Sequence, residues 1–181
     1  NRDLWGVDDA FLLGDRLLIA PVLQENAASR IVHLPHGEWV DYWGGRVHQG
    51  GQSIEVPVNL ETIPVFVRAG SILPEKEGEV LHLGIYAPGK NEPWLDPALS
   101  LYSDAGDGYG DWRVDNLIAK PDTQGIDIQW ESQGTYPFPY SEIQLNFRGT
   151  PATGLFIDGV DGSTRENVVL TVPFRSLKIS F

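Results

Sequence analysis

The stretch GIDIQW, Gly125–Trp130, alternates apolar with polar residues, and this alternation decides the fold. Side chains along an extended strand point to opposite faces in turn, so Ile126, Ile128 and Trp130 share one face. The segment EIQLNF, Glu142–Phe147, repeats the pattern. Both segments therefore predict strands with one buried face and one solvated face.

Short runs rich in β-branched and aromatic residues recur along the rest of the chain and are separated by glycine and proline. The longest stretch without either residue is Val22–Leu34, which is 13 residues and leaves no room for a set of long helices. Besides the two segments above, the runs expected to form strands are RLLIAPV (Arg16–Val22), RIVHL (Arg30–Leu34), SIEVPV (Ser53–Val58), VFVRA (Val65–Ala69) and LFID (Leu155–Asp158). Such frequent turns favour sandwiches over alternating strand and helix units, so we predict an all-β fold of two small antiparallel β-sandwich units.

Two segments qualify this picture. The residues Asp8–Leu13 stand before Gly14 in the way that the last turn of a helix stands before a glycine cap, which predicts a short helical remnant at the N-terminus. A charged turn is expected at Pro74–Gly78, followed by fresh strand signal in Val80–Tyr86. We place the division between the two β units at this turn.

The composition indicates an acidic globular chain. Lys+Arg 13 against Asp+Glu 25 gives a formal net charge of −12, which argues against nucleic acid or an anionic membrane surface as a partner. The chain has no cysteine, which excludes a disulfide framework and a cysteine-ligated metal. No apolar run approaches the roughly 18 residues of a membrane span. Because the sequence starts at Asn1 and holds no methionine, we expect it to be part of a longer chain.

The densest acidic cluster is SDAGDGYGD, Ser103–Asp111. Asp104, Asp107 and Asp111 could converge as the carboxylates of a glycosidase or as calcium ligands. The alternative is a hairpin tip, because aspartate and glycine suit tight turns. The cluster lacks the ligand spacing of a helix–loop–helix calcium site, so we favour the turn and predict no metal. A calcium-stabilised sandwich remains an alternative that a melting experiment can test.

The histidines offer a second candidate metal site. His33, His36 and His48 could be zinc ligands, but a proline-broken hairpin is not the helical face that such spacing uses, so we expect loop or strand-end histidines instead. The chain also lacks the nucleophile elbow, the phosphate-binding loop and the dinucleotide-binding glycine motif. We therefore predict no catalytic residue and no cofactor.

Aromatic side chains are the candidate binding residues. Trp39, Trp43, Tyr109 and Trp112 offer flat apolar faces with a polar tip, which suit the C–H faces and hydroxyl groups of a sugar. The alternative is that these rings fill the core of a sandwich. By parity Trp39 and Trp43 would lie on the same side of one strand. Both interpretations stay open at this point.

Three longer segments stand in one order along the first half of the chain: FLLGDRLLIAPVLQ (Phe11–Gln24), IVHLPHGEWVDYWGG (Ile31–Gly45) and IPVFVRAGSILP (Ile63–Pro74). Together they resemble the region that follows the catalytic barrel in family 31 glycoside hydrolases, the α-glucosidase and α-xylosidase group. LSLYSDAGDGYGDWRVD (Leu99–Asp115) is similar to the aspartate-rich hairpin of that family's distal C-terminal domain. It departs from the family pattern at Ala105, since two aspartates normally stand together before the glycine.

The resemblance implies a division of the chain into residues 1–14 as the end of the catalytic barrel, 15–74 as a proximal β-sandwich and 75–181 as a distal β-sandwich. The family's catalytic aspartates lie on barrel strands, so no residue here inherits their role. The resemblance thus implies a non-catalytic C-terminal part of a retaining α-glycosidase, whose partner is the (β/α)8 barrel of the same parent chain.

An α-glycan oligosaccharide is a further candidate partner. The alternative function is an independent carbohydrate-binding β-sandwich module. If a barrel covers the proximal unit, we expect an apolar surface around the strands Arg16–Val22 and Val65–Ala69.

Overall fold

The computed structural model describes residues 6–89, 92–95, 98–106, 109–122, 125–162, 167–171 and 173–181. All regular structure in these ranges is β-strand, which confirms the all-β prediction. Within the same ranges no helix has the length and apolar character needed to cross a membrane. All but one of the strand ladders found there are antiparallel, and the exception pairs two strands of the larger unit described below.

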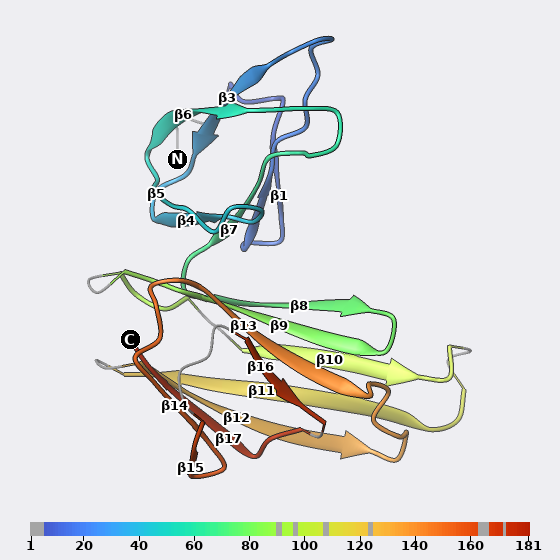
Figure 1. The fold of residues 1–181 in the computed structure, drawn as a ribbon. Helices are drawn as coiled ribbons and strands as arrows, with labels where there is room; N and C mark the ends of the chain where they lie inside the picture. Colours follow the sequence, from blue (N-terminus) through green and yellow to red (C-terminus); the bar gives the residue numbers. More distant parts are fainter. Residues whose placement is uncertain are drawn as a thin grey trace.

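A smaller unit comprises the first seven strands and forms the upper part of Figure 1. Its strands are β1 (Phe11–Leu13), β2 (Leu17–Ile19), β3 (Ser29–Leu34), β4 (Glu38–Asp41), β5 (Val47–Gln49), β6 (Gln52–Pro57) and β7 (Val65–Arg68). Five of them form a sheet in the order β1-β2-β7-β4-β5, and β3 pairs with β6 in a separate ladder. The ladder of β3 and β6 covers one face of the five-stranded sheet.

Strand alternation explains how the five-stranded sheet is buried on both faces. Leu18, Trp39 and Phe66 are buried together with residues of β3 and form the core of the smaller unit. The neighbours of these residues along β4 and β7, Val40 and Val67, point the other way and are equally buried in a different cluster. The second face must therefore be covered from outside the smaller unit.

A larger unit contains the remaining ten strands (Figure 1). Its strands are β8 (Ser71–Glu77), β9 (Val80–Ala87), β10 (Leu99–Asp104), β11 (Trp112–Pro121), β12 (Gly125–Gly134), β13 (Glu142–Gly149), β14 (Gly154–Ile157), β15 (Val160–Asp161), β16 (Asn167–Leu170) and β17 (Ser176–Ser180). A six-stranded sheet, β10-β11-β12-β17-β14-β15, packs on a four-stranded sheet, β16-β13-β9-β8. β9 and β13 form the parallel ladder, with Glu142 opposite Val80.

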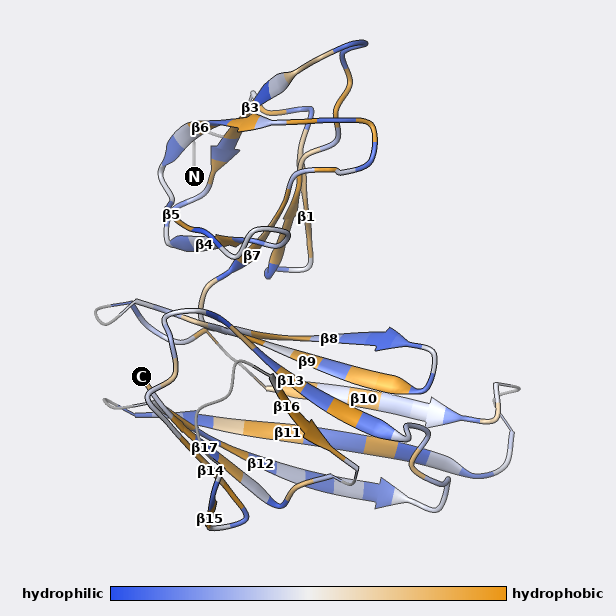
Figure 2. Ribbon diagram, viewed as in Figure 1, coloured by the Kyte–Doolittle hydropathy of each residue, from blue (hydrophilic) through white to orange (hydrophobic). Residues whose placement is uncertain are grey.

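The core of the larger unit follows the alternation seen in the sequence. Ile143 and Leu145 of β13 face Ile126 and Ile128 of β12 across the sandwich, and all four are buried in one cluster. Figure 2 shows the alternation as hydrophilic and hydrophobic bands along β13. The seven segments expected to be strands overlap β2, β3, β6, β7, β12, β13 and β14, which confirms these predictions.

An apolar junction joins the two units. Val40, Val67 and Ala69 of the smaller unit are buried against Tyr86 of β9, with Leu73 of β8 packed beside them. The larger unit therefore covers the second face of the five-stranded sheet. Burial of apolar area from two separate sheets in one cluster stabilises their relative position.

Hydrogen bonds reinforce this junction. The Glu38 carboxylate accepts a hydrogen bond from the Gly89 backbone N–H at 2.6 Å. The Arg16 guanidinium donates to the carbonyl oxygens of Ile72 at 3.1 Å and Ala98 at 2.9 Å. Each bond joins an element of the smaller unit to a segment of the larger one, so the junction has both apolar and polar contacts.

The expected helix before Gly14 is wrong where it covers Phe11–Leu13. These residues form β1, which pairs with β2 so that Leu13 lies opposite Leu17. Gly14 has a φ of 63°, which suits the turn of this hairpin as well as it would suit a helix cap. A glycine at this position is therefore compatible with both a hairpin turn and a helix cap, and it does not distinguish between them.

The expected charged turn at Pro74–Gly78 is wrong for most of its length, because residues up to Glu77 belong to β8. The expected boundary between residues 74 and 75 lies inside this strand. The division of the chain into residues 1–14, 15–74 and 75–181 stays a prediction.

Candidate functional site

Trp39 belongs to the core of the smaller unit. Its side chain is 1% exposed, and its indole Nε1 donates to the Pro35 carbonyl oxygen at 2.9 Å. The Arg68 guanidinium lies 6.0 Å from the ring centroid. In this conformation Trp39 has no face to offer to a sugar, and packing is its role.

Trp43 is in the turn that follows β4, and 59% of it is exposed. The interpretation that Trp39 and Trp43 share one side of a strand is therefore wrong, because β4 ends at Asp41. The Asp41 carboxylate accepts hydrogen bonds from the backbone N–H groups of Trp43 and Gly44, which closes the turn. The indole Nε1 donates to the Ile63 carbonyl oxygen at 2.8 Å and holds the exposed ring in place.

Tyr109 and Trp112 lie at the tip of the hairpin formed by β10 and β11, where they are 84% and 43% exposed. Asp104 pairs with Trp112 at the last step of the ladder, which confirms that the acidic cluster is a hairpin tip. The Asp104 carboxylate accepts from the Gly106 backbone N–H at 2.7 Å. Asp107 lies outside the described residues. The tip is on the larger unit, so the structure does not bring the four predicted aromatics together.

The histidines do not form a cluster with other ligands. His33 Nδ1 lies 2.6 Å from the Ser53 hydroxyl, and the His48 ring packs edge-on against Phe66. Burial lowers the pKa of His48, and nearby Arg46 acts in the same direction. Across the described ranges, no three side chains of His, Asp or Glu stand close enough to hold a metal ion.

Asp115 is a fully buried carboxylate that the sequence analysis did not single out. Its oxygens accept from the Arg113 guanidinium at 2.7 and 2.9 Å, from Trp130 Nε1 at 2.9 Å and from the Ser132 hydroxyl at 2.6 Å. Burial alone would raise the pKa of Asp115, but these hydrogen bonds outweigh it and hold the pKa below its ordinary value. With its lone pairs engaged, Asp115 is a structural anion of β11 and β12.

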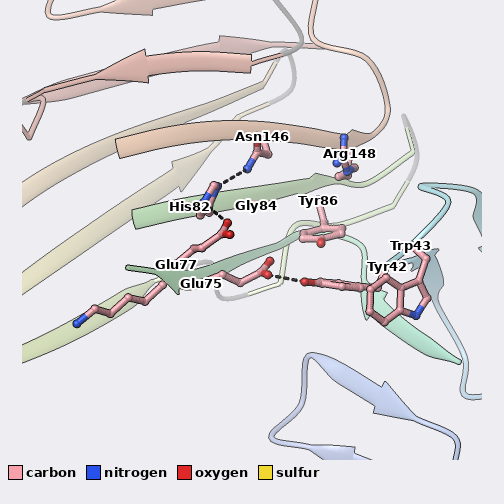
Figure 3. Close-up of a pocket in the computed structure, with 10 residues that line it drawn as sticks. Tyr42, Trp43, Glu75, Glu77, His82, Gly84, Tyr86, Asn146 and Arg148 are labelled. Atoms are coloured by element: carbon pink, nitrogen blue, oxygen red, sulfur yellow. Dashed lines mark hydrogen bonds and ion pairs between the residues drawn. The ribbon is translucent and has the colours of Figure 1, made fainter. Parts of the chain in front are cut away.

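A polar cleft of about 340 Å³ lies where the smaller unit meets the outer face of the four-stranded sheet (Figure 3). Four segments line it: Tyr42 and Trp43 of the turn after β4, Glu75, Lys76 and Glu77 of β8, His82, Gly84 and Tyr86 of β9, and Asn146 and Arg148 of β13. The volume is at the lower end of the roughly 300–1,000 Å³ usual for ligand sites. Within the described residues, this cleft combines side chains from both units with exposed charge.

Strand register puts the side chains that β8, β9 and β13 contribute on one face, except for Lys76, whose ammonium lies over the ring of Tyr140. Glu75 of β8 lies opposite His82 of β9, and β13 places Asn146 opposite Gly84. Because alternate residues of the same strands enter the core, the residues between them face outward into the cleft. Gly84 allows the ring of Tyr86 to pack against the strand, since an added Cβ would lie 2.8 Å from that ring.

Two separate sets of polar contacts lie in the cleft (Figure 3). The Tyr42 hydroxyl donates a short hydrogen bond to the Glu75 carboxylate and so joins the two units. His82 lies between Asn146, 3.4 Å from its Nδ1, and Glu77, 3.6 Å from its Nε2. An amide nitrogen can only donate, so Nδ1 accepts and Nε2 carries the proton toward Glu77.

Electrostatics in the cleft affect the tyrosines most. The hydrogen bond to Glu75, together with burial, raises the pKa of Tyr42 to about 12. Burial, with the nearby Glu75 charge, raises the pKa of Tyr86 as well. Both phenols therefore stay protonated at neutral pH, and the Tyr42 hydroxyl donates its hydrogen bond to Glu75.

Of the cleft residues, the sequence analysis had singled out Trp43 alone as a binding candidate. Glu75 and Glu77 had been assigned to a turn, and Asn146 and Arg148 had no assigned role. A signal was present, because polar residues alternate with core residues in both β9 and β13. That signal shows that each strand has a wet face, but it does not show that β9 and β13 are neighbours.

The arrangement of sheets matches regions of known glycoside hydrolases. A family 31 dextranase of Flavobacterium johnsoniae, solved in complex with glucose, superimposes on 100% of this chain and 28% of its own, with a TM-score of 0.76 and 22% identity. At that identity the likeness concerns the fold. The fold is therefore that of an all-β region found within a glycoside hydrolase.

The sequence comparisons give the family. Residues 1–73 match the model of the glycosyl hydrolase family 31 C-terminal domain, so this part of the chain carries that domain. Alpha-glucosidase 2 of Bacillus thermoamyloliquefaciens is 29% identical over 172 residues, which cover 88% of this chain and 21% of that protein. The α-xylosidase of Saccharolobus solfataricus is 34% identical over 119 residues, 60% of this chain and 16% of that protein. The chain thus spans about a fifth of the length of such relatives.

Proposed function

We propose that this chain is a non-catalytic C-terminal β region of a retaining α-glycosidase and that it supports the (β/α)8 barrel of the same parent chain. The observation that carries the proposal is an exposed apolar groove on the smaller unit. Val22, Leu23, Leu60 and Ile63 line this groove of about 810 Å³, and Leu60 is fully exposed. We call these four residues the barrel-facing surface.

The position of this surface differs from the sequence expectation. The strand Val65–Ala69 had been expected to face the barrel, but Phe66 and Val67 are completely buried at the centre of the five-stranded sheet. The exposed apolar residues instead occupy the loops after β2 and before β7, and the edge strand β1. Exposed apolar patches on a soluble chain mark surfaces that another part of the assembly covers.

The proposal predicts that the same substitutions act differently in two contexts. Leu23→Asn with Leu60→Asn should leave the melting temperature of the 181-residue chain unchanged, because both side chains already contact water. In the intact parent enzyme the pair should lower the melting temperature of the catalytic domain. Val160→Asn, at an exposed position of the larger unit, is the matched control. Equal effects in both contexts would contradict the proposal.

Absence of hydrolysis is the second test. The purified chain should not hydrolyse p-nitrophenyl α-glucoside or α-xyloside, since we assign it no catalytic aspartate. Activity that persists through further purification would overturn this part of the proposal. The length of the native gene product is the first quantity to measure. A product several hundred residues longer on the N-terminal side supports the barrel, whereas a product of this size favours an independent carbohydrate-binding module.

A further inference from the structure

The polar cleft combines donors and acceptors in a way that restricts its ligand. Two carboxylates, Glu75 and Glu77, and the Arg148 guanidinium line it together with His82, whereas the Lys76 ammonium points away and lies 5.9 Å from the ring centroid of Tyr140. The cleft therefore presents charged groups of both signs. A ligand with groups that both donate and accept hydrogen bonds would use both kinds of side chain.

Part of this hydrogen-bonding capacity is unused within the protein. The Arg148 side chain is exposed, and in the part of the chain that the structure describes no hydrogen bond or ion pair engages its guanidinium. The Glu77 side chain is 88% exposed, and one of its carboxylate oxygens lies 3.6 Å from His82 Nε2. The Arg148 Cδ lies 3.7 Å from the position of a Cβ on Gly45, so the smaller unit holds the stem of this side chain.

Apolar surface adjoins these polar groups. The Trp43 ring lies at the end of the cleft nearest the smaller unit and packs edge-on against Tyr42, with centroids 4.9 Å apart (Figure 3). The Tyr86 ring packs against Gly84. Both rings are fixed, Trp43 by its hydrogen bond to the Ile63 carbonyl oxygen and Tyr86 by burial. A fixed ring gives contact area with little loss of conformational entropy.

We propose that this cleft binds a neutral oligosaccharide, with Arg148, Asn146 and Glu77 hydrogen-bonding its hydroxyl groups and Trp43 contacting an apolar sugar face. Hydroxyl groups donate and accept at once, and the C–H face of a pyranose matches an aromatic ring. The site is formed entirely by this chain. It does not depend on the barrel-facing surface, which lies on different loops.

The proposal separates the cleft from the aromatic candidates of the sequence. Tyr109 and Trp112 lie at a hairpin tip outside the cleft, and Trp39 is buried. Of these four aromatic residues, Trp43 is the one that lines the cleft with an exposed ring. Removal of Tyr109 or Trp112 should therefore leave binding unchanged.

The test is calorimetric titration of the 181-residue chain with isomaltotriose. Arg148→Ala should weaken binding about tenfold, because the substitution removes a charge-assisted donor, and Asn146→Ala should have an effect of similar size. Arg175→Ala, which removes an exposed arginine of the bend before β17, is the control with the same change of charge and should bind as the wild type does. Unchanged melting temperatures show that the variants remain folded.

Three outcomes would overturn the proposal. The wild type could show no binding heat with millimolar isomaltotriose, or Arg148→Ala could weaken binding no more than Arg175→Ala does. Inorganic phosphate could also bind more tightly than the trisaccharide, which would make the cleft an anion site. Each outcome leaves the barrel proposal standing, because that proposal is tested by melting of the parent enzyme.

Discussion

The two units differ in how completely they cover their own apolar surface. Among its described residues, the larger unit encloses a cluster of fourteen buried residues between its two sheets. The smaller unit has a cluster of six and relies on the larger unit to cover the second face of its main sheet. Nine of the fifteen large exposed hydrophobic residues found in the described ranges belong to residues 11–63. The smaller unit is thus the part whose stability depends on its neighbours.

The largest expected effect comes from cavities in the two cores. Leu145→Ala should cost about 2–5 kcal/mol and Phe66→Ala about 3–5 kcal/mol of unfolding free energy. Loss of the larger unit exposes Val40 and Val67, so Leu145→Ala should lower the stability of both units together. Phe66→Ala should loosen the smaller unit first. Native-state hydrogen exchange, which reports on each strand, distinguishes the two patterns.

The contrasting result would be that each substitution affects its own unit alone. Phe66→Ala would then leave the exchange of amides in the larger unit unchanged, and Leu145→Ala would leave the exchange of amides in the smaller unit unchanged. Such a result would mean that the junction contributes little to the smaller unit.

The buried ion pair of the larger unit should give the next effect. Asp115→Asn should cost about 3 kcal/mol, the lower end for a broken buried pair, because Arg113 reaches solvent. The amide NH2 of the new asparagine also directs a hydrogen-bond donor at the Arg113 guanidinium and the Trp130 indole N–H, which are donors themselves. Urea denaturation measures the loss, with Asp161→Asn, at an exposed carboxylate, as the control. A cost equal to that of the control would contradict a structural role.

Asp115 also predicts an acid limb of stability. Its pKa is lower in the folded chain, so the unfolded chain binds the proton first as the pH falls. The stabilisation is complete above the unfolded pKa and is lost as the pH falls through the folded pKa. The difference in stability between wild type and Asp115→Asn should therefore shrink at low pH. A constant difference across the acid range would be inconsistent with this linkage.

A smaller effect is expected at the junction. Tyr42→Phe removes the hydrogen bond to Glu75 and should cost about 1 kcal/mol. The folded pKa of Tyr42 is about 12, above the ordinary value of 10.0, so its stabilisation is present below pH 10 and is lost as the pH rises toward 12. Tyr42→Phe should lack this contribution to the alkaline loss of stability. Tyr136→Phe is the control, and identical alkaline profiles for wild type and Tyr42→Phe would count against the bond.

The smallest effect on folding is expected at the barrel-facing surface. Leu23→Asn with Leu60→Asn should change the unfolding free energy of the 181-residue chain by no more than about 0.5 kcal/mol. The same pair should reduce self-association in sedimentation velocity, because an uncovered apolar groove can pair with another copy. Self-association that persists in the variant would mean that a different surface mediates it.

Much of the fold could be predicted from local sequence. Alternation in Gly125–Trp130 and Glu142–Phe147 was sufficient because each strand has one buried face, and residue identity reports burial directly. The helix expected over Phe11–Leu13 failed because Gly14 serves a hairpin turn and a helix cap equally well. Three apolar residues in succession carry no period that would separate the two structures.

The cleft could not be predicted because its members come from four segments whose proximity depends on long-range pairing. Asn146 and His82 are neighbours only because β13 lies beside β9. Tyr42 reaches Glu75 only because the smaller unit docks on β8 and β9. Local pattern assigns faces to strands, but it does not say which strands adjoin. The alternation in β9 and β13 identified the wet faces, and the structure supplied their assembly.

The parallel ladder of β9 and β13 also has a consequence for how the chain is made. Val80 pairs with Glu142, a separation of 142 − 80 = 62 residues, so during synthesis β9 leaves the ribosome well before its partner exists. Leu81, Leu83 and Ile85 then lack the opposite sheet that later buries them. Pairing over such a distance is slow, and nascent chains stopped before β13 should recruit chaperones that release them once β17, which supplies Leu177 and Ile179 to this core, has emerged.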